Sequence, residues 1–177
     1  MNNEMIAKGK KYIMGTYSQA PIVIEKGEGV ILTDNTGKEY IDMVSGIAVN
    51  SLGYGHPAVV KAIQEQAEKL IHISNLYWNV PQIELAEKLC QRTGMSNVFF
   101  ANGGGEANEG MIKLARKYSF DKYGKGRSTI ITLNHSFHGR TMATITATGQ
   151  PHYHTYFFPF VEDFRYADPT LESIQAQ

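Results

Sequence analysis

The sequence predicts an α/β fold, and three consecutive segments carry that prediction. Val98–Phe100 is a short apolar run, Glu106–Tyr118 has the spacing of a helix, and Ser128–Leu133 is rich in β-formers. A strand, a helix and a second strand in this order form a βαβ crossover, whose two strands run parallel. The helix has one apolar face, made by Met111, Leu114, Ala115 and Tyr118.

The preceding residues contain a second, smaller β unit. Gly29–Asp34 and Lys38–Val44 are β-rich, and Asn35-Thr36-Gly37 between them is typical of a hairpin turn. Met1–Ala20 is interpreted as an arm with little pattern, and Gly46–Gly55 as a glycine-punctuated loop.

Two helices are expected between these β units. Pro57 favours a helix start, and the apolar face that follows is Val60, Ile63, Ala67 and Leu70. Pro81 favours a second start, with Leu85 and Leu89 one turn apart and Gly94 as the stop.

The remaining segments are less distinct. Thr141–Thr148 fits either a strand, from its threonines, or a short helix, from its spacing. The tail from Pro151 is aromatic and shows no period. Two recognisable parallel strands are few for an α/β domain, because parallel sheets are normally covered on both faces. We therefore expect the 177 residues to be part of a larger α/β protein.

Composition excludes several classes of partner. Seventeen Lys and Arg balance seventeen Asp and Glu, so no net charge attracts nucleic acid or an anionic membrane. Cys90 is the single cysteine, which indicates a reducing compartment, and Met1–Ala20 lacks the apolar core of a signal peptide. No apolar run approaches the roughly 20 residues that span a bilayer. We expect a soluble, cytoplasmic protein.

Two glycine-containing loops are the candidate functional sites. Gly103–Gly105 precedes the predicted helix, whose free N–H groups could bind an anion; the alternative is a tight turn with no ligand. The dinucleotide fingerprint and the Walker motif both fail here, and we expect Glu106 and Glu109 to point away from any anion. The second loop, His135–Thr141, offers an aromatic ring for a planar ligand and a guanidinium for a carboxylate. Because loops after parallel strands share one sheet edge, the two loops should lie together.

The residues around both loops resemble the class III, fold-type I pyridoxal-phosphate-dependent aminotransferases. The matching stretches are 34–57, 74–89, 99–118 and 133–150, and the nearest match is to members that act on N-acetylornithine. The resemblance implies an N-terminal arm and small-domain hairpin in residues 1–56. Residues 57–177 would then hold the first βαβ portion of a mostly parallel, cofactor-binding large domain.

The resemblance also implies roles for individual residues. Gly104 and Gly105 would bind the phosphate of pyridoxal 5'-phosphate, and Phe137 would stack on its ring. Arg140 would bind the substrate carboxylate, while Tyr77 and Trp78 would line the substrate cleft. The implied reaction transfers an ω-amino group from acetylornithine or a related amine to 2-oxoglutarate, in a homodimer of arginine biosynthesis.

Three departures from the family qualify these expectations. Gly103 stands where the family has serine, which removes a hydroxyl, and Gly110 replaces an alanine inside the helix, which costs about 1 kcal/mol. The family's Schiff-base lysine lies beyond the matching stretches, so no catalytic residue is assigned. We expect the chain alone to be inactive; the alternative is a non-catalytic phosphate-binding or interaction module.

The histidines and the aromatic tail each have a plainer interpretation. His135, His138, His152 and His154 lack the partners and spacing of a zinc site, so no metal is expected. His138 is interpreted as structural. The tail aromatics would be core in a complete enzyme or, if exposed, an association surface; they are Tyr153, Tyr156, Phe157, Phe158 and Phe160.

Overall fold

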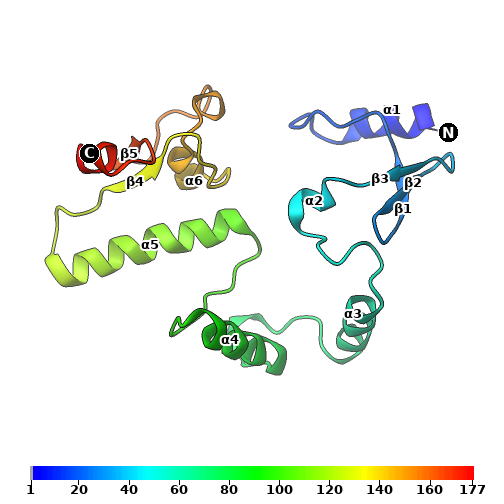
Figure 1. The fold of residues 1–177 in the computed structure, drawn as a ribbon, viewed down its shortest axis with the longest axis horizontal. Coiled ribbons are helices and arrows are strands. Elements are labelled where there is room, and N and C mark those ends of the chain that lie inside the picture. Colours follow the sequence, from blue (N-terminus) through cyan, green and yellow to red (C-terminus); the bar gives the residue numbers. More distant parts are fainter. Residues whose placement is uncertain (1) are drawn as a thin grey trace. The chain divides into compact units, whose positions relative to one another are not determined.

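The computed structural model describes residues 2–177, which separate into two compact units. The first unit extends to Tyr77 and the second runs from Trp78 to Gln177. Figure 1 shows the order of the helices and strands along the chain. The first unit contains α1 (Asn2–Tyr12), β1 (Ile24–Glu28), β2 (Ile31–Asp34), β3 (Glu39–Ile41), α2 (Ser45–Ala48), α3 (Pro57–Lys69) and η1 (Ser74–Leu76).

The sheet of the first unit is antiparallel, in the order β1-β2-β3. The predicted hairpin is confirmed, since β2 pairs with β3 and Ile31 lies opposite Ile41. Strand β1 was not predicted, because its sequence IEKGE has little β character; it forms by pairing with β2. Within the N-terminal arm, whose weak pattern predicted no particular element, Asn2–Tyr12 forms helix α1.

The hairpin turn is organised by the buried carboxylate of Asp34. Its Oδ1 accepts hydrogen bonds from the Thr36 hydroxyl (2.6 Å), the Thr36 N–H (2.8 Å) and the Lys38 N–H (3.0 Å). Its Oδ2 accepts one from the Tyr40 hydroxyl at 2.9 Å. These donors stabilise the ionised form, above all the Thr36 hydroxyl, and they lower the pKa of Asp34 to about 2.

This depressed pKa predicts that acid weakens the hairpin. A carboxyl whose folded pKa lies below its ordinary value of 3.8 stabilises the fold fully above that pH. The contribution of Asp34 should therefore disappear as the pH falls from about 4 to about 2. An NMR titration of the Asp34 carboxyl carbon measures the folded pKa. The variant Asp34→Asn has no titrating group at this position and should lose the pH dependence of hairpin stability in this range. A midpoint near 3.8 would show that the turn does not hold the carboxylate.

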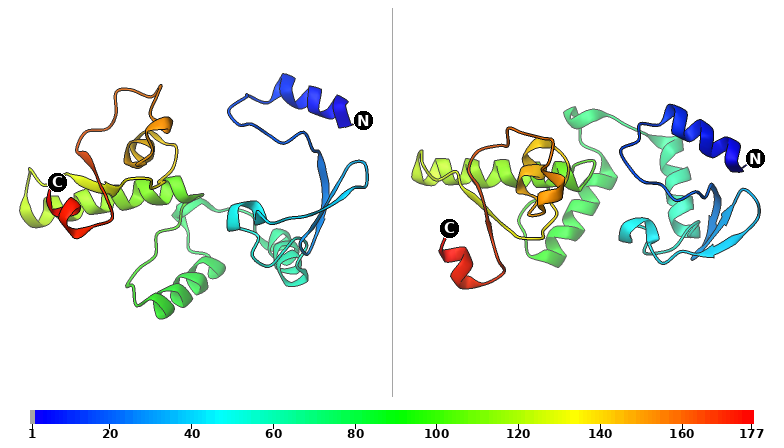
Figure 2. Two further views of the ribbon diagram at one scale, coloured as in Figure 1. Left: turned by 45° about the horizontal axis from the view of Figure 1, so that its top comes forward. Right: turned by 90° about the horizontal axis from the view of Figure 1, so that it is seen from above.

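The second unit combines four α-helices with a short parallel sheet. Strands β4 and β5 pair in parallel, with Ile130 opposite Phe164 and Leu133 opposite Ala167. Helix α6 lies between them in sequence and contacts both α5 and β5 (Figures 1 and 2). The unit contains α4 (Val80–Thr93), α5 (Gly104–Tyr123), β4 (Ile130–Leu133), α6 (Met142–Ala147), η2 (Pro151–Tyr153), β5 (Phe164–Ala167) and α7 (Leu171–Gln175).

The predicted α/β class is confirmed, but the strands of the crossover are not those expected. Val98–Phe100 forms no strand among the described residues, and the parallel pair is β4 with β5. The ring of Phe99 instead lies against Gly110, whose missing Cβ would sit 2.8 Å from the Phe99 Cε1. Gly110 therefore makes room for this ring, which is a structural reason for a glycine inside α5.

The helix starts and stops follow the local signals. Helices α3 and α4 form as predicted, and Gly94 ends α4 in the left-handed conformation with φ of 73°. The ambiguous segment Thr141–Thr148 is helical from Met142 to Ala147. Thr141 and Thr144 cap its start reciprocally, which explains why a threonine-rich sequence begins a helix.

The core of the second unit lies around α6. Its buried apolar residues are Ile112, Ile145, Ala147 and Ala167, and Thr144, Thr146 and Thr148 are fully buried beside them. The threonine hydroxyls bond within the helix, as Thr146 Oγ1 does to the Met142 carbonyl (2.7 Å). Among the tail aromatics, Tyr156, Phe157 and Phe158 are exposed, and an association surface there stays a prediction.

Candidate functional site

The glycine turn leads directly into the start of α5. Gly103 is the N-cap in an extended conformation (φ −170°, ψ 175°), and no side chain caps the helix. The N–H groups of Gly104, Gly105 and Glu106 have no acceptor among residues 2–177, and the first helical bond is Ala107 N–H to the Gly103 carbonyl. Three free donors at the positive end of a 20-residue helix can bind an anion.

Helix α5 holds the loop of residues 135–141 against this turn. The Asn108 side-chain amide donates to the His138 carbonyl at 2.7 Å, and the Thr141 hydroxyl donates to the Glu109 carboxylate. A Cβ on Gly139 would lie 2.9 Å from the Cα of Gly105, so only a glycine permits this approach. The two loops lie together as predicted, although the strand expected before the first one is absent from the described fold.

The two carboxylates of the first turns have donors of their own. Glu106 accepts from the backbone and side-chain nitrogens of Asn102 at 2.8 and 2.9 Å, and Glu109 is engaged by Thr141. Neither carboxylate accepts a hydrogen bond from Gly104 or Gly105 within the described chain. The donors of the glycine turn are therefore not consumed by the acidic residues beside them.

The loop 135–141 is also fixed from the side of α6. The His138 N–H donates to the Thr148 hydroxyl and the Thr141 N–H to the Thr144 hydroxyl, both at 3.0 Å. The His138 ring lies 3.3 Å from the Ser136 hydroxyl through its Nδ1. These contacts give His138 a place in the loop framework, in line with its interpretation as structural.

An aromatic and cationic cluster stands on this loop. Phe137 is 54% exposed, and its ring centroid lies 5.6 Å from that of Tyr153, with the planes tilted by 60°. The Arg140 guanidinium lies over the same Tyr153 ring, 5.4 Å from its centroid. Sequence reasoning did not assign Tyr153 to the site, because the aromatic segment from Pro151 shows no periodic pattern. The one signal that could have indicated it was its position shortly after the segment Thr141–Thr148.

Tyr77 and Trp78 lie at the boundary between the two units. Tyr77 ends the first unit and Trp78 begins the second, and they are 70% and 88% exposed. Within residues 78–177, no hydrogen bond or ring contact joins the Trp78 side chain to Gly104, Gly105 or Phe137. Their role in a substrate cleft stays a prediction.

The described residues hold no cluster of metal ligands and no helix suited to cross a membrane. Residues 2–177 hold no group of three His, Cys, Asp or Glu side chains placed to share a metal ion. His152 stacks on Tyr153, and His154 contacts the Ile145 carbonyl. Within the same range, no helix has the length and apolar character that crossing a membrane requires.

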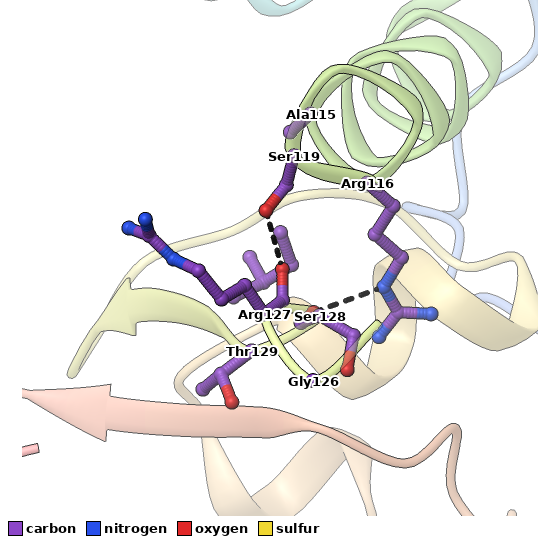
Figure 3. Close-up of a pocket in the computed structure, with 8 residues that line it drawn as sticks. Ala115, Arg116, Ser119, Gly126, Arg127, Ser128 and Thr129 are labelled. Atoms are coloured by element: carbon purple, nitrogen blue, oxygen red, sulfur yellow. Dashed lines mark hydrogen bonds between the residues drawn. The ribbon is translucent and has the colours of Figure 1, made fainter. Parts of the chain in front are cut away.

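A pocket of about 380 Å³ lies where hydrogen bonds connect α5 to the segment that leads into β4 (Figure 3). The Arg116 Nε donates to the Ser128 carbonyl at 3.2 Å and its Nη2 to the Glu162 carbonyl at 2.8 Å. Arg127 extends in the other direction, over the Tyr123 ring. The two guanidinium groups do not converge, so the pocket does not have the geometry of an anion site.

Comparisons with known proteins agree with this geometry. A family model described as aminotransferase class-III matches residues 12–177. The acetylornithine aminotransferase of Caldanaerobacter subterraneus subsp. tengcongensis is 57% identical over 172 residues, which are 97% of this chain and 43% of that protein. The acetylornithine aminotransferase of Methanocaldococcus jannaschii is 46% identical over 157 residues, 89% of this chain and 39% of the relative.

Solved structures show the same fold. The ornithine aminotransferase of Toxoplasma gondii ME49 is 26% identical, with a TM-score of 0.93, and the match covers 99% of this chain and 42% of that one. A Bacillus anthracis aminotransferase is 34% identical with a TM-score of 0.87, covering 94% and 38%. The chain thus spans about two fifths of the length of these relatives. From its fold, its glycine turn and the match over residues 12–177, the chain belongs to the class-III aminotransferase family.

Proposed function

We propose that this chain forms the phosphate-binding turn and the ring-facing loop of a pyridoxal-5'-phosphate-dependent aminotransferase. The observation that carries the proposal is the contact between the two loops, in which Gly105 and Gly139 approach closely beside the free N–H groups of α5. The name that these relatives carry, acetylornithine aminotransferase, supports N-acetylornithine or a related ω-amino acid as the amino donor. We propose 2-oxoglutarate as the acceptor.

The residues fit a ligand with a phosphate and a flat ring. Space is open where a Cβ would stand on Gly103 and on Gly104, so an anion can approach the N–H groups closely. The exposed face of Phe137 stands on the adjoining loop and can stack on an aromatic ring. Pyridoxal 5'-phosphate joins these two features in one molecule, and when bound it supplies the electron sink for transamination.

The chain's own residues would bind and orient. The amides of Gly104 and Gly105 would hold the phosphate, and Phe137 would fix the plane of the ring. Arg140 would bind a substrate carboxylate through its planar guanidinium, next to the Tyr153 ring that it already covers. Tyr77 and Trp78 are proposed to line the substrate cleft.

The wider assignments are also proposals. They are a small-domain segment in residues 1–56, the start of the cofactor-binding domain in residues 57–177, a homodimer, and a cytoplasmic place in arginine biosynthesis. By its contacts, α3 groups with the first unit.

The catalytic amine is not assigned to any lysine of this chain. Lys113, the lysine nearest in sequence to the glycine turn, lies about 13 Å along α5 from Gly104, given a rise of about 1.5 Å per residue. We propose that the 177 residues alone bind the cofactor without turnover. Assay of the purified chain with N-acetylornithine and 2-oxoglutarate checks this, and measurable turnover would contradict it.

A proline at position 104 tests the phosphate role of the turn. Gly104 is the first helical residue, where proline is well tolerated, and the extended Gly103 before it suits a following proline. Gly104→Pro should therefore keep the fold but remove one N–H donor to the anion. A charge-assisted hydrogen bond contributes about 1.5–3 kcal/mol, so we expect binding to weaken at least about tenfold.

The probe for this experiment is pyridoxine 5'-phosphate, which has the ring and the phosphate but no aldehyde. Surface lysines cannot react with it, so calorimetric titration reports the site alone. The matched control is Gly104→Ala, which adds a side chain into open space and retains the N–H, and should bind within about twofold of the wild type. Equal affinities in the proline and alanine variants would refute a role for this amide.

A further inference from the structure

We propose that Asn108 is a positioning residue that orients Phe137 and Arg140 toward a ligand held at the glycine turn. The inference rests on the proposed function and adds to it a residue without an assigned role. It concerns the one hydrogen bond by which an α5 side chain reaches the main chain of the 135–141 loop within residues 2–177.

The bond is made to His138, one of the two residues between Phe137 and Arg140. Asn108 Nδ2 donates to the His138 carbonyl at 2.7 Å, while the His138 N–H is held by the Thr148 hydroxyl on the other side. The carbonyl belongs to the peptide that precedes Gly139, whose φ of +136° is open only to glycine. His138, which precedes the flexible Gly139, is thus held by α5 on one side and by the C-cap residue of α6 on the other.

The same helix turn makes a second link at the end of the loop. Glu109, the next residue of α5, accepts a hydrogen bond from the Thr141 hydroxyl. Helix α5 therefore binds the loop at His138, just before Gly139, and at Thr141, just after Arg140. Helix α5 also presents the free N–H groups of Gly104 and Gly105 one turn earlier. Asn108 therefore connects the anion-binding element to the ring-binding element within a single rigid helix.

This geometry predicts different effects on two ligands. Inorganic phosphate needs only the glycine turn, whereas pyridoxine 5'-phosphate also needs the ring face of Phe137. In Asn108→Ala the affinity for inorganic phosphate should stay within about twofold. The affinity for pyridoxine 5'-phosphate should fall about threefold to tenfold, the loss expected for one hydrogen bond, and the induced circular dichroism of its ring should weaken.

The matched control is Ser119→Ala. Ser119 lies on the same helix and also donates to a main-chain carbonyl at 2.7 Å, that of Arg127, but at the far end of α5 (Figure 3). This variant should bind both ligands as the wild type does. Asn108→Gln retains an amide donor and should recover part of the ring signal.

The outcomes separate this inference from the proposed function. The positioning role is overturned if Asn108→Ala keeps both affinities and the dichroism. It is also overturned if Asn108→Ala and Ser119→Ala lose the same affinity for each of the two ligands. A wild-type chain that binds neither ligand contradicts the proposed function instead. Hydrogen exchange without ligand then decides the positioning role: residues 138–141 should exchange faster in Asn108→Ala, and unchanged exchange overturns it.

Discussion

Replacing Gly139 with alanine is expected to destroy the candidate site. A Cβ at this position would stand 2.6 Å from the Thr144 Oγ1 and 2.9 Å from the Cα of Gly105. The φ of +136° adds backbone strain of about 1–3 kcal/mol for any residue with a side chain. The loop must move away from α5, which separates Phe137 from the N–H groups of the glycine turn. Binding of pyridoxine 5'-phosphate should therefore fall more than about tenfold, since it loses ring and phosphate alignment together.

The matched control for this substitution is Gly94→Ala. Gly94 also has a positive φ, 73°, but no atom lies within 4 Å of its missing Cβ. Alanine at this position therefore adds backbone strain but no steric clash. Gly94 lies at the end of α4, outside the site. Gly94→Ala should be destabilised by about 1 kcal/mol and still bind the probe. If Gly139→Ala bound as well as Gly94→Ala does, the close approach of the two loops would be irrelevant to the ligand.

The elements that sequence reasoning found have strong local signals. Pro57 and Pro81 set helix starts, Gly94 sets a stop, and Asn35-Thr36-Gly37 sets a hairpin, because each residue restricts its own backbone. The site residues Gly104 and Phe137 could likewise be proposed from loop composition. These features depend on few contacts with distant residues, so they can be predicted from the sequence alone.

The elements that it missed depend on partners far away in the chain. Strand β5, FRYA, exists because it pairs with β4, more than 30 residues earlier. Val98–Phe100 has the composition of a strand but no partner among the described residues, so its local preference is not realised. The link from Asn108 to His138 spans 30 residues and leaves no periodic trace in the sequence. These three features depend on contacts that are present or absent far along the chain, which a local reading of the sequence does not reveal.

Gly149 illustrates the same limit and gives the second large effect, this time on folding. It follows α6 and bridges Asn134 at the end of β4, and its carbonyl accepts from the His135 N–H at 2.7 Å. A Cβ there would lie 2.1 Å from the Leu133 carbonyl oxygen and 3.0 Å from the Asn134 Cα, both main-chain atoms that cannot rotate away. Alanine must therefore push the segment that follows α6 away from the end of β4.

We expect Gly149→Ala to lower the free energy of unfolding by about 3 kcal/mol or more, at the upper end of overpacking effects, because the clash is with backbone. Urea denaturation followed by circular dichroism measures the loss. The matched control is Gly103→Ala, also in the second unit, where the backbone is extended and nothing lies within 4 Å of the new Cβ. That variant should unfold within about 1 kcal/mol of the wild type. Equal stability of the two variants would mean that the segment after α6 can move away from β4 without cost, and that its contact with Leu133 and Asn134 does not hold the loop of Phe137 and Arg140 in place.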